Sequence, residues 1–213
     1  HIGRFHQCGE RYEEALRLDA DNAGILQEYG DSLIRMGSPT QALGIFDRIL
    51  TISPGNRKAM LSKMRAHSSL GEKEGCSTLV QQFVTSPHWA EESQPVVIEM
   101  LISCGGHSEA QHILDDLLRS KPRDLRLLRL SIKNHTLARN FDEAVRIADT
   151  VMKISDEGFD DHMVKAGIQF QKGDLKGSKR TLANILRLQP SYLPALSLLK
   201  DVAKEEGDEV AVM

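Results

Sequence analysis

The chain has 213 residues, of which 40% are hydrophobic, 27% are charged and 5% are aromatic, with 7 prolines. This composition is ordinary for a folded helical protein and too apolar for intrinsic disorder. The formal net charge of −3 gives the chain as a whole no electrostatic attraction to nucleic acid or to an anionic membrane surface, so neither partner is expected.

A helical hairpin is predicted between Ala23 and Asn56. Apolar residues recur there at every third or fourth position on both sides of Gly37, which is typical of two amphipathic helices joined by a tight turn. Pro54 marks the end of the second helix. Residues 1–22 match the second half of such a hairpin, so we expect a partial repeat before the first complete one.

The hairpin pattern returns every 34 residues without insertion or deletion. The turn glycine is repeated at Gly71, Gly105, Arg139, Gly173 and Gly207; the small position holds Ala42, Cys76, Ala110, Ala144 and Ser178; the bulky position holds Phe46, Val80, Leu114, Ala148 and Leu182. A small residue lets the second helix approach the first, and a large one fills the space between hairpins. Because a lone hairpin cannot bury both faces, the hairpins are expected to stack.

These marks resemble the tetratricopeptide repeat (TPR) family, whose motif is similar to the set Leu26, Tyr29, Gly30, Leu33, Ala42, Phe46 and Pro54. The resemblance implies an all-α fold, an α-α superhelix in the form of a right-handed solenoid of antiparallel helical hairpins. It implies one solenoid over 1–213, with a partial repeat at 1–22, full repeats at 23–56, 57–90, 91–124, 125–158 and 159–192, and a terminal helix and tail at 193–213. The repeat at 57–90 departs most from the motif, and we expect irregular packing or a wider turn near residues 86–89.

The resemblance also implies a non-catalytic scaffold for protein–protein interaction or assembly, with partners in a concave groove lined by the first helix of each hairpin. The groove positions of the family correspond here to the candidate partner-binding residues Lys58, Arg65, Glu99, Arg126, Arg129 and Lys133, and also to Leu137, Asp160, Met163 and Gln171. Some members hold a peptide's C-terminal carboxylate with Lys and Asn. The asparagine positions here carry Asp31, Arg65, Glu99 and Lys133, so that clamp is absent.

A basic face is predicted on the helix that begins near residue 125. Arg126, Arg129 and Lys133 are spaced by three and four residues and therefore share one side of the helix. Such a face favours an acidic partner, through a peptide carboxylate, acidic side chains or a phosphate. The alternative is a solvated face, partly neutralised by Glu92 and Glu99 on the adjoining helix.

Residue patterns for catalysis or metal binding are missing from the sequence. It contains no HExxH, GxSxG or P-loop motif, and His67 and His135 are expected to be partly buried between helices. We therefore expect no catalytic residues, no metal and no cofactor. The chain has three cysteines, Cys8, Cys76 and Cys104, an odd number without a CxxC motif. This pattern argues against a disulfide framework or a zinc site and suits a reducing compartment.

The apolar runs are shorter than the roughly 18–20 residues that a membrane span needs, and no signal peptide opens the chain. A cytoplasmic location without a membrane span is expected. Because the first residue is His1 and not Met, a missing leader or anchor leaves a periplasmic or anchored protein as the alternative. The partial repeats at both ends favour a segment of a longer protein.

Two other functions remain open at this point. One is the repeat region of a longer multidomain enzyme, such as a transferase, whose catalytic domain lies outside this chain. The other is an RNA-binding helical repeat, which the acidic groove residues oppose. Self-association is also expected, because apolar residues lie near both ends, around Phe5 and around Leu196, Val202 and Val212.

Overall fold

The computed structural model describes residues 2–85, 93–155 and 158–207, with side chains described from residue 9 onward. Over these residues the chain is all-α, with no strand, as the repeat pattern predicts. It divides into two compact units, residues 1–110 (unit 1) and 111–213 (unit 2). Across the described ranges, no helix is both long and apolar enough to cross a lipid bilayer.

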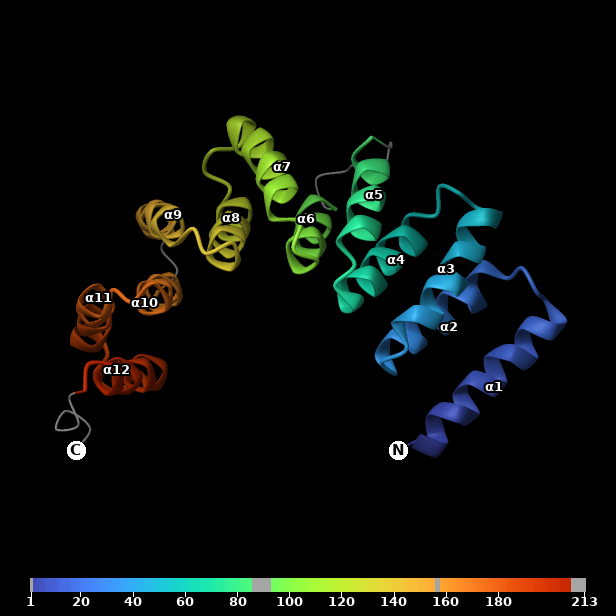
Figure 1. The fold of residues 1–213 in the computed structure, drawn as a ribbon, viewed down its shortest axis with the longest axis horizontal. Coiled ribbons are helices and arrows are strands. Elements are labelled where there is room, and N and C mark those ends of the chain that lie inside the picture. The colour runs from blue at the N-terminus through green and yellow to red at the C-terminus, as the bar shows by residue number, and fades with distance from the viewer. Residues whose placement is uncertain (1, 86–92, 156–157, 208–213) are drawn as a thin grey trace. The chain divides into compact units, whose positions relative to one another are not determined.

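Unit 1 is a succession of antiparallel helices in which each packs on its neighbours, as Figure 1 shows for α2, α3, α4 and α5. Its helices are α1 (Ile2–Leu18), α2 (Ala23–Arg35), α3 (Pro39–Ile52), α4 (Arg57–Leu70), α5 (Lys73–Val84) and α6 (Gln94–Ser103); α7 (His107–Ser120) contains the boundary with unit 2.

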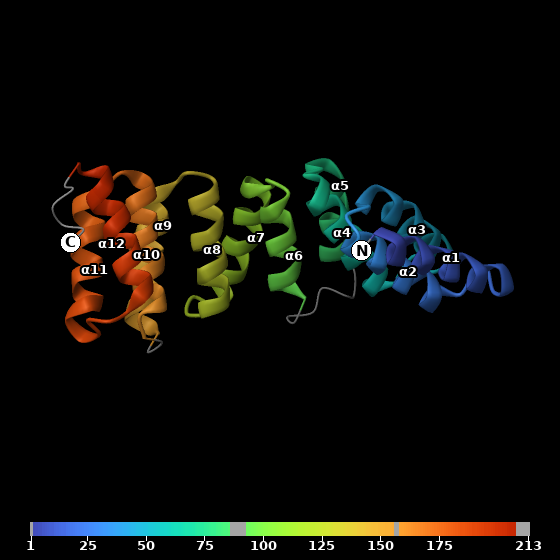
Figure 2. The ribbon, with the colours of Figure 1, turned by 90° about the horizontal axis from the view of Figure 1, so that it is seen from below.

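Unit 2 continues the same pattern, and Figure 2 shows α9, α10, α11 and α12 packed side by side. Its helices are α8 (Leu125–Leu137), α9 (Phe141–Ile154), α10 (Asp160–Lys172), α11 (Leu175–Leu188) and α12 (Leu193–Glu205). The first helices α2, α4, α8 and α12 begin at the residues where the 34-residue spacing places the start of a repeat. The division of the chain into repeats stays a prediction.

The turns within the hairpins share one backbone conformation. The φ angle is positive at Gly37, Gly71, Gly105, Arg139, Gly173 and Gly207, which are spaced by 34 residues. At Gly37 the N–H bonds to Ile34 O, and the following N–H of Ser38 bonds to Leu33 O. The same pair of bonds closes the turns at the next four positions, as in the Schellman ending of a helix. Arg139, with φ of 60°, adopts the left-handed conformation that favours glycine.

The repeated apolar positions form the core. The five small residues, Ala42, Cys76, Ala110, Ala144 and Ser178, are each 0% exposed. The residues at the bulky position, from Phe46 to Leu182, are also buried. The sequence therefore identified correctly which side chains hold each hairpin together. His67 is partly buried as expected, with its side chain 13% exposed and its Nδ1 2.7 Å from Glu72 Oε2.

The cysteine pattern argues against a disulfide framework, but Cys76 and Cys104 form a disulfide. They are 28 residues apart in the sequence, but packing of α5 on α6 brings the small position of α5 beside the C-terminal end of α6. Linear spacing did not reveal this proximity because it arises between neighbouring hairpins. The pairing removes the support that the cysteines gave to a reducing compartment.

The residues expected to drive self-association differ in exposure. Val202 is fully buried against Ala166 and Leu182, so its assignment to an exposed apolar end is wrong. Leu196 is 41% exposed. The turn at residues 86–89 and Val212 lie outside the described residues, as do the side chains of Phe5 and Cys8. Self-association stays a prediction.

Candidate interaction groove

The predicted partner-binding residues belong to different units. Arg126, Arg129 and Lys133 share α8 in unit 2, whereas Lys58, Arg65 and Glu99 lie in unit 1, on α4 and α6. Lys58, Arg65 and Glu99 are all exposed. Lys58 Nζ lies 3.6 Å from Glu28 Oε1, an ion pair between α4 and α2. The six predicted residues therefore come from both units, and their role in partner binding stays a prediction.

In unit 1, the successive first helices α2 and α4 are joined by a short polar network. Ser62 Oγ donates to Asp31 Oδ1 at 2.7 Å, and Gln27 Nε2 donates to Ser62 Oγ at 2.9 Å and to Asp31 Oδ2 at 3.1 Å. Gln27 and Ser62 are both buried. Because all three side chains are short, the network holds α2 directly against α4. The Asp31 carboxylate is thus engaged within the protein at one of the positions where a clamp would place an asparagine.

In unit 2, α8 and α10 are joined by a longer ionic contact. Arg129 Nε and Nη2 donate to the two carboxylate oxygens of Asp161 at 3.1 Å and 3.0 Å, and Nη2 also lies 3.5 Å from Ser155 Oγ. Burial alone would raise the pKa of Asp161, but hydrogen bonds from Arg129 and Ser155 outweigh it and hold that pKa below its ordinary value. Asp161, from the partner helix α10, therefore neutralises the middle cation of the basic face.

The structure adds a neutralising residue, Asp161, that the sequence did not suggest, and neutralisation by Glu92 and Glu99 stays a prediction. Glu92 lies outside the described residues, and Glu99 is on α6 in unit 1. Asp161 follows Arg129 by 32 residues and occupies the first turn of α10. A carboxylate near the start of the next first helix was the available signal, since the 34-residue stacking places that turn opposite Arg129.

A groove with a volume of 660 Å³ lies between α8 and α10, with α9 as its floor. We call it the α8–α10 groove; it is lined by Arg129, Ile132, Lys133, Thr136, Leu137, Ala148, Val151, Asp160, Asp161, Met163, Val164, Gly167, Ile168 and Gln171. Its size is within the range of ligand-binding pockets. Leu137 and Val164 are 54% and 46% exposed, so two large apolar side chains at its mouth are open to solvent.

Unit 2 carries different residues at the positions that join α2 to α4 in unit 1. The 34-residue register places Arg129, Lys133 and Val164 at the positions of Gln27, Asp31 and Ser62. The short network of unit 1 is therefore replaced in unit 2 by one long side chain, that of Arg129, which reaches Asp161 on α10. Gly167 occupies the position of Arg65 in the repeat and has no side chain to fill the groove. A β-carbon built on it would meet no atom within 4 Å.

The packing between the first and second helix is conserved in unit 2, although the large and the small residue have exchanged places. In unit 1 the Phe46 ring lies so close to Gly30 that a β-carbon there would collide with it. The equivalent residues in unit 2 are Ala148 and Ile132, so the large side chain comes from α8 and the small one from α9. One large and one small residue meet in both units, which conserves packing. The groove therefore opens beside this packed layer, where Gly167 and Val164 lie on α10.

Of the two outer cations of the basic face, Lys133 lines the groove, whereas Arg126 lies on α8 beyond the end that Arg129 and Asp161 close. Arg126 is 65% exposed in its side chain and lies 3.9 Å from Asp124, the residue that caps α8. Lys133 is exposed and lines the groove. Apart from Asp160 and Asp161 at its N-terminal end, the α10 wall of the groove is uncharged. The groove therefore has Arg129 and Lys133 on its α8 wall, an apolar floor, and an α10 wall that is uncharged beyond Asp160 and Asp161.

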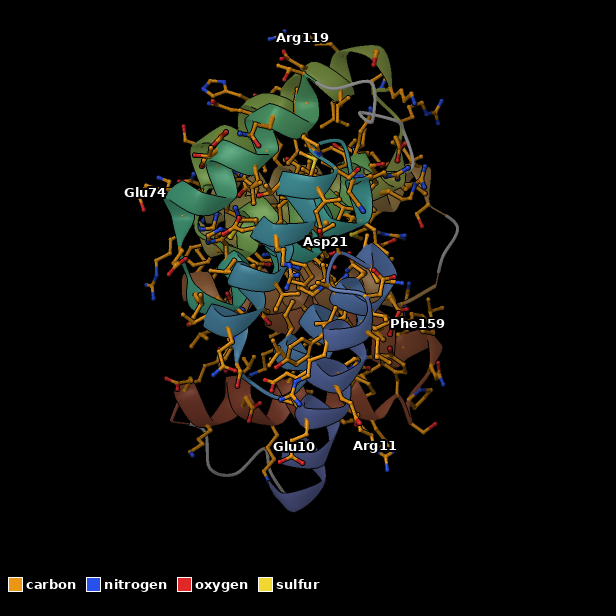
Figure 3. The ribbon with its side chains drawn as sticks, turned by 90° about the vertical axis from the view of Figure 1, so that its right-hand side faces the viewer. Glu10, Arg11, Asp21, Glu74, Arg119 and Phe159 are labelled. Atoms are coloured by element: carbon orange, nitrogen blue, oxygen red, sulfur yellow. A yellow bond between two sulfur atoms is a disulfide. The ribbon has the colours of Figure 1, made fainter. Side chains whose placement is uncertain are left out.

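The described part of the chain contains no cluster of three His, Cys, Asp or Glu side chains able to hold a metal ion. Burial lowers the pKa of His135, the main effect, while Glu143 and Asp115 oppose it. Other charged side chains, such as Glu74 on α5 and Arg119 on α7, point away from the helices into solvent (Figure 3).

No sequence-family model matches the chain, and no curated protein matches it at a significant level. Solved structures do match it, and they are TPR proteins; the chain has the TPR-like fold. A TPR protein from Parabacteroides merdae is 14% identical, with a TM-score of 0.62 over 94% of this chain and 78% of that one.

Two further structures show the same likeness at low sequence identity. A MamA fragment from Desulfovibrio magneticus is 15% identical, with a TM-score of 0.58 over 80% of this chain and 96% of that one. YrrB, a TPR protein with an unusual peptide-binding site, is 13% identical, with a TM-score of 0.54 over 90% of this chain and 99% of that one. At these identities the comparison establishes the fold.

Proposed function

We propose that this chain is a non-catalytic scaffold that binds a protein partner in the α8–α10 groove. The observation that carries the proposal is the groove itself, which combines a 660 Å³ volume with the exposed apolar side chains of Leu137 and Val164. Exposed apolar surface beside charged residues is typical of protein-binding sites. The peptide-binding site of YrrB, which has the same fold, is in keeping with this proposal.

Filling the groove tests the proposal. Gly167 lies in the interior of α10, and a side chain added there enters open space. Gly167→Leu should therefore block the groove while favouring the helix, because leucine has the higher helix propensity. Gly44→Leu is the matched control, since Gly44 lies inside α3 in unit 1, is exposed and also has open space around it.

The experiment uses the full chain and both variants as baits in an extract of the source cells. A protein that is retained by the wild type and by Gly44→Leu, but lost with Gly167→Leu, is then purified and its affinity for all three is measured. We expect the Gly167→Leu variant to bind at least about tenfold more weakly. Equal affinity for the two variants would show that the groove is not the docking site.

A further inference from the structure

The groove has features that select the conformation and charge of its occupant. We propose that the α8–α10 groove binds an amphipathic α-helix whose apolar stripe enters the groove and whose flank facing α8 is acidic. This inference rests on the proposed function, because it specifies the partner for the same groove. Three properties of the groove support it: its hydrogen-bonding groups, its length and its charge distribution.

The hydrogen-bonding groups favour a helix over an extended peptide. An extended peptide exposes backbone N–H and C=O groups that need partners when they are buried. Thr136 and Gln171 are the uncharged hydrogen-bonding residues among those that line the groove, and the Thr136 hydroxyl donates to Ile132 O at 2.8 Å. A helix satisfies its own backbone groups internally, so it can occupy an apolar groove without such partners.

The length of the groove suits two turns of helix. It extends along α8 from Arg129, where the ion pair with Asp161 closes one end, to Leu137 near the other. These residues are eight positions apart, which corresponds to about 12 Å along the helix axis. A ligand helix would cover that length with apolar residues at positions i, i+3 or i+4, and i+7. Ile132, Met163 and Val164 supply apolar surface along the same length.

The charges set the orientation of the acidic flank. Arg126 and Lys133 are seven residues apart, so they lie on the same side of α8, and both are exposed. Between them, Arg129 is bonded to Asp161 across the groove. Because the α10 wall beyond its first turn is uncharged, carboxylates on a ligand helix gain most when they face α8. A basic flank in that position would meet like charges.

Fluorescein-labelled synthetic peptides test these requirements by anisotropy. The first peptide is an alanine-based helix with leucines at i, i+3 and i+7 and glutamates on one flank; the second has lysine in place of each glutamate; the third has a central proline. We expect the acidic helix to bind the wild-type chain at least about tenfold more tightly than either other peptide, because proline breaks the helix and lysine meets the like charge of Lys133.

Variants of the chain locate the binding and its charge preference. Gly167→Leu should weaken binding of the acidic helix at least about tenfold, whereas Gly44→Leu leaves it unchanged. Lys133→Glu should narrow or invert the preference between the acidic and basic peptides. Leu137→Glu provides a second block of the groove on an exposed position, in case Gly167→Leu does not fold.

Each failure has a separate meaning. Equal binding of the proline peptide, still sensitive to Gly167→Leu, overturns the helical occupant and leaves the groove as a docking site. Equal binding of the lysine peptide overturns the acidic flank. If no peptide binds the wild type saturably up to about 1 mM, while a cellular partner is still lost with Gly167→Leu, the helix inference fails and the proposed function stands. Insensitivity of both peptide and cellular partner to Gly167→Leu overturns both.

Discussion

The α2–α4 pair in unit 1 and the α8–α10 pair in unit 2 occupy equivalent places in the repeat but are joined differently. Short neutral and acidic side chains, Gln27, Ser62 and Asp31, hold α2 against α4. One long ion pair, Arg129–Asp161, holds α8 to α10 and leaves a groove beside it. Successive first helices are thus joined by a network of three uncharged and acidic side chains in unit 1 and by a bidentate ion pair beside the groove in unit 2.

The two units also differ in what stabilises them, because unit 1 contains the disulfide. Removing it through Cys104→Ser should lower the free energy of unfolding of unit 1 by about 3–4 kcal/mol, the value expected for a closed loop of about 28 residues. Unit 2 should be little affected. Hydrogen–deuterium exchange followed by mass spectrometry of peptides measures the two units separately, and equal loss of protection in both would contradict a local effect.

A thiol count provides the control for this prediction. The chain has 3 cysteines, so the denatured, unreduced protein should expose one reactive thiol, that of Cys8. After reduction all three should react. Three reactive thiols before reduction would show that Cys76 and Cys104 are unpaired under the conditions of preparation.

Weakening the contact between successive first helices should lower the free energy of unfolding more in unit 2 than in unit 1. Asp161→Asn leaves Arg129 with a neutral partner, and we expect a loss of about 1–2 kcal/mol, a moderate value because the Arg129 side chain is 37% exposed. Asp31→Asn keeps an acceptor for Ser62 and should cost about 1 kcal/mol or less. Urea denaturation of the two variants gives the comparison, and a larger loss for Asp31→Asn would contradict it.

The effect of Asp161→Asn should depend on pH. The folded-state pKa of Asp161 is lowered from its ordinary value of 3.8. A group with a lowered pKa stabilises the folded state fully above that ordinary value, and its contribution is lost as pH falls through the folded-state pKa. The difference between wild type and Asp161→Asn should therefore be constant near neutral pH and shrink below about pH 3.8. A difference that shrinks already at neutral pH would contradict this assignment.

The smallest expected effect concerns the turns. Arg139 adopts a positive φ that glycine holds at the equivalent position Gly71. Arg139→Gly should stabilise unit 2 by about 1 kcal/mol, and Gly71→Ala should destabilise unit 1 by about the same amount. Both follow from thermal or urea unfolding. A loss of stability in Arg139→Gly would show that contacts of the arginine outweigh its backbone strain.

Much of the fold could be predicted because its determinants are local. The turn positions from Gly37 to Gly207, the buried small residues and the helix starts follow from the spacing of apolar residues and turn residues along the chain. The candidate site was predicted less completely. The basic face of α8 was placed on the correct helix, since spacings of three and four define a helical face. That pattern gave no indication that Arg129 is engaged by Asp161.

By itself, the sequence determined the hairpins, their register and the face on which each charged residue lies, since these depend on residues within one or two helical turns. Only the tertiary structure decided the pairing of Cys76 with Cys104, the burial of Val202 and the opening of the α8–α10 groove. These depend on distances between side chains that are far apart in the sequence, such as the 28 residues that separate Cys76 and Cys104, and on the side-chain lengths that stacking brings together. The empty position at Gly167 becomes a groove only once Arg129 and Asp161 set the gap between the helices.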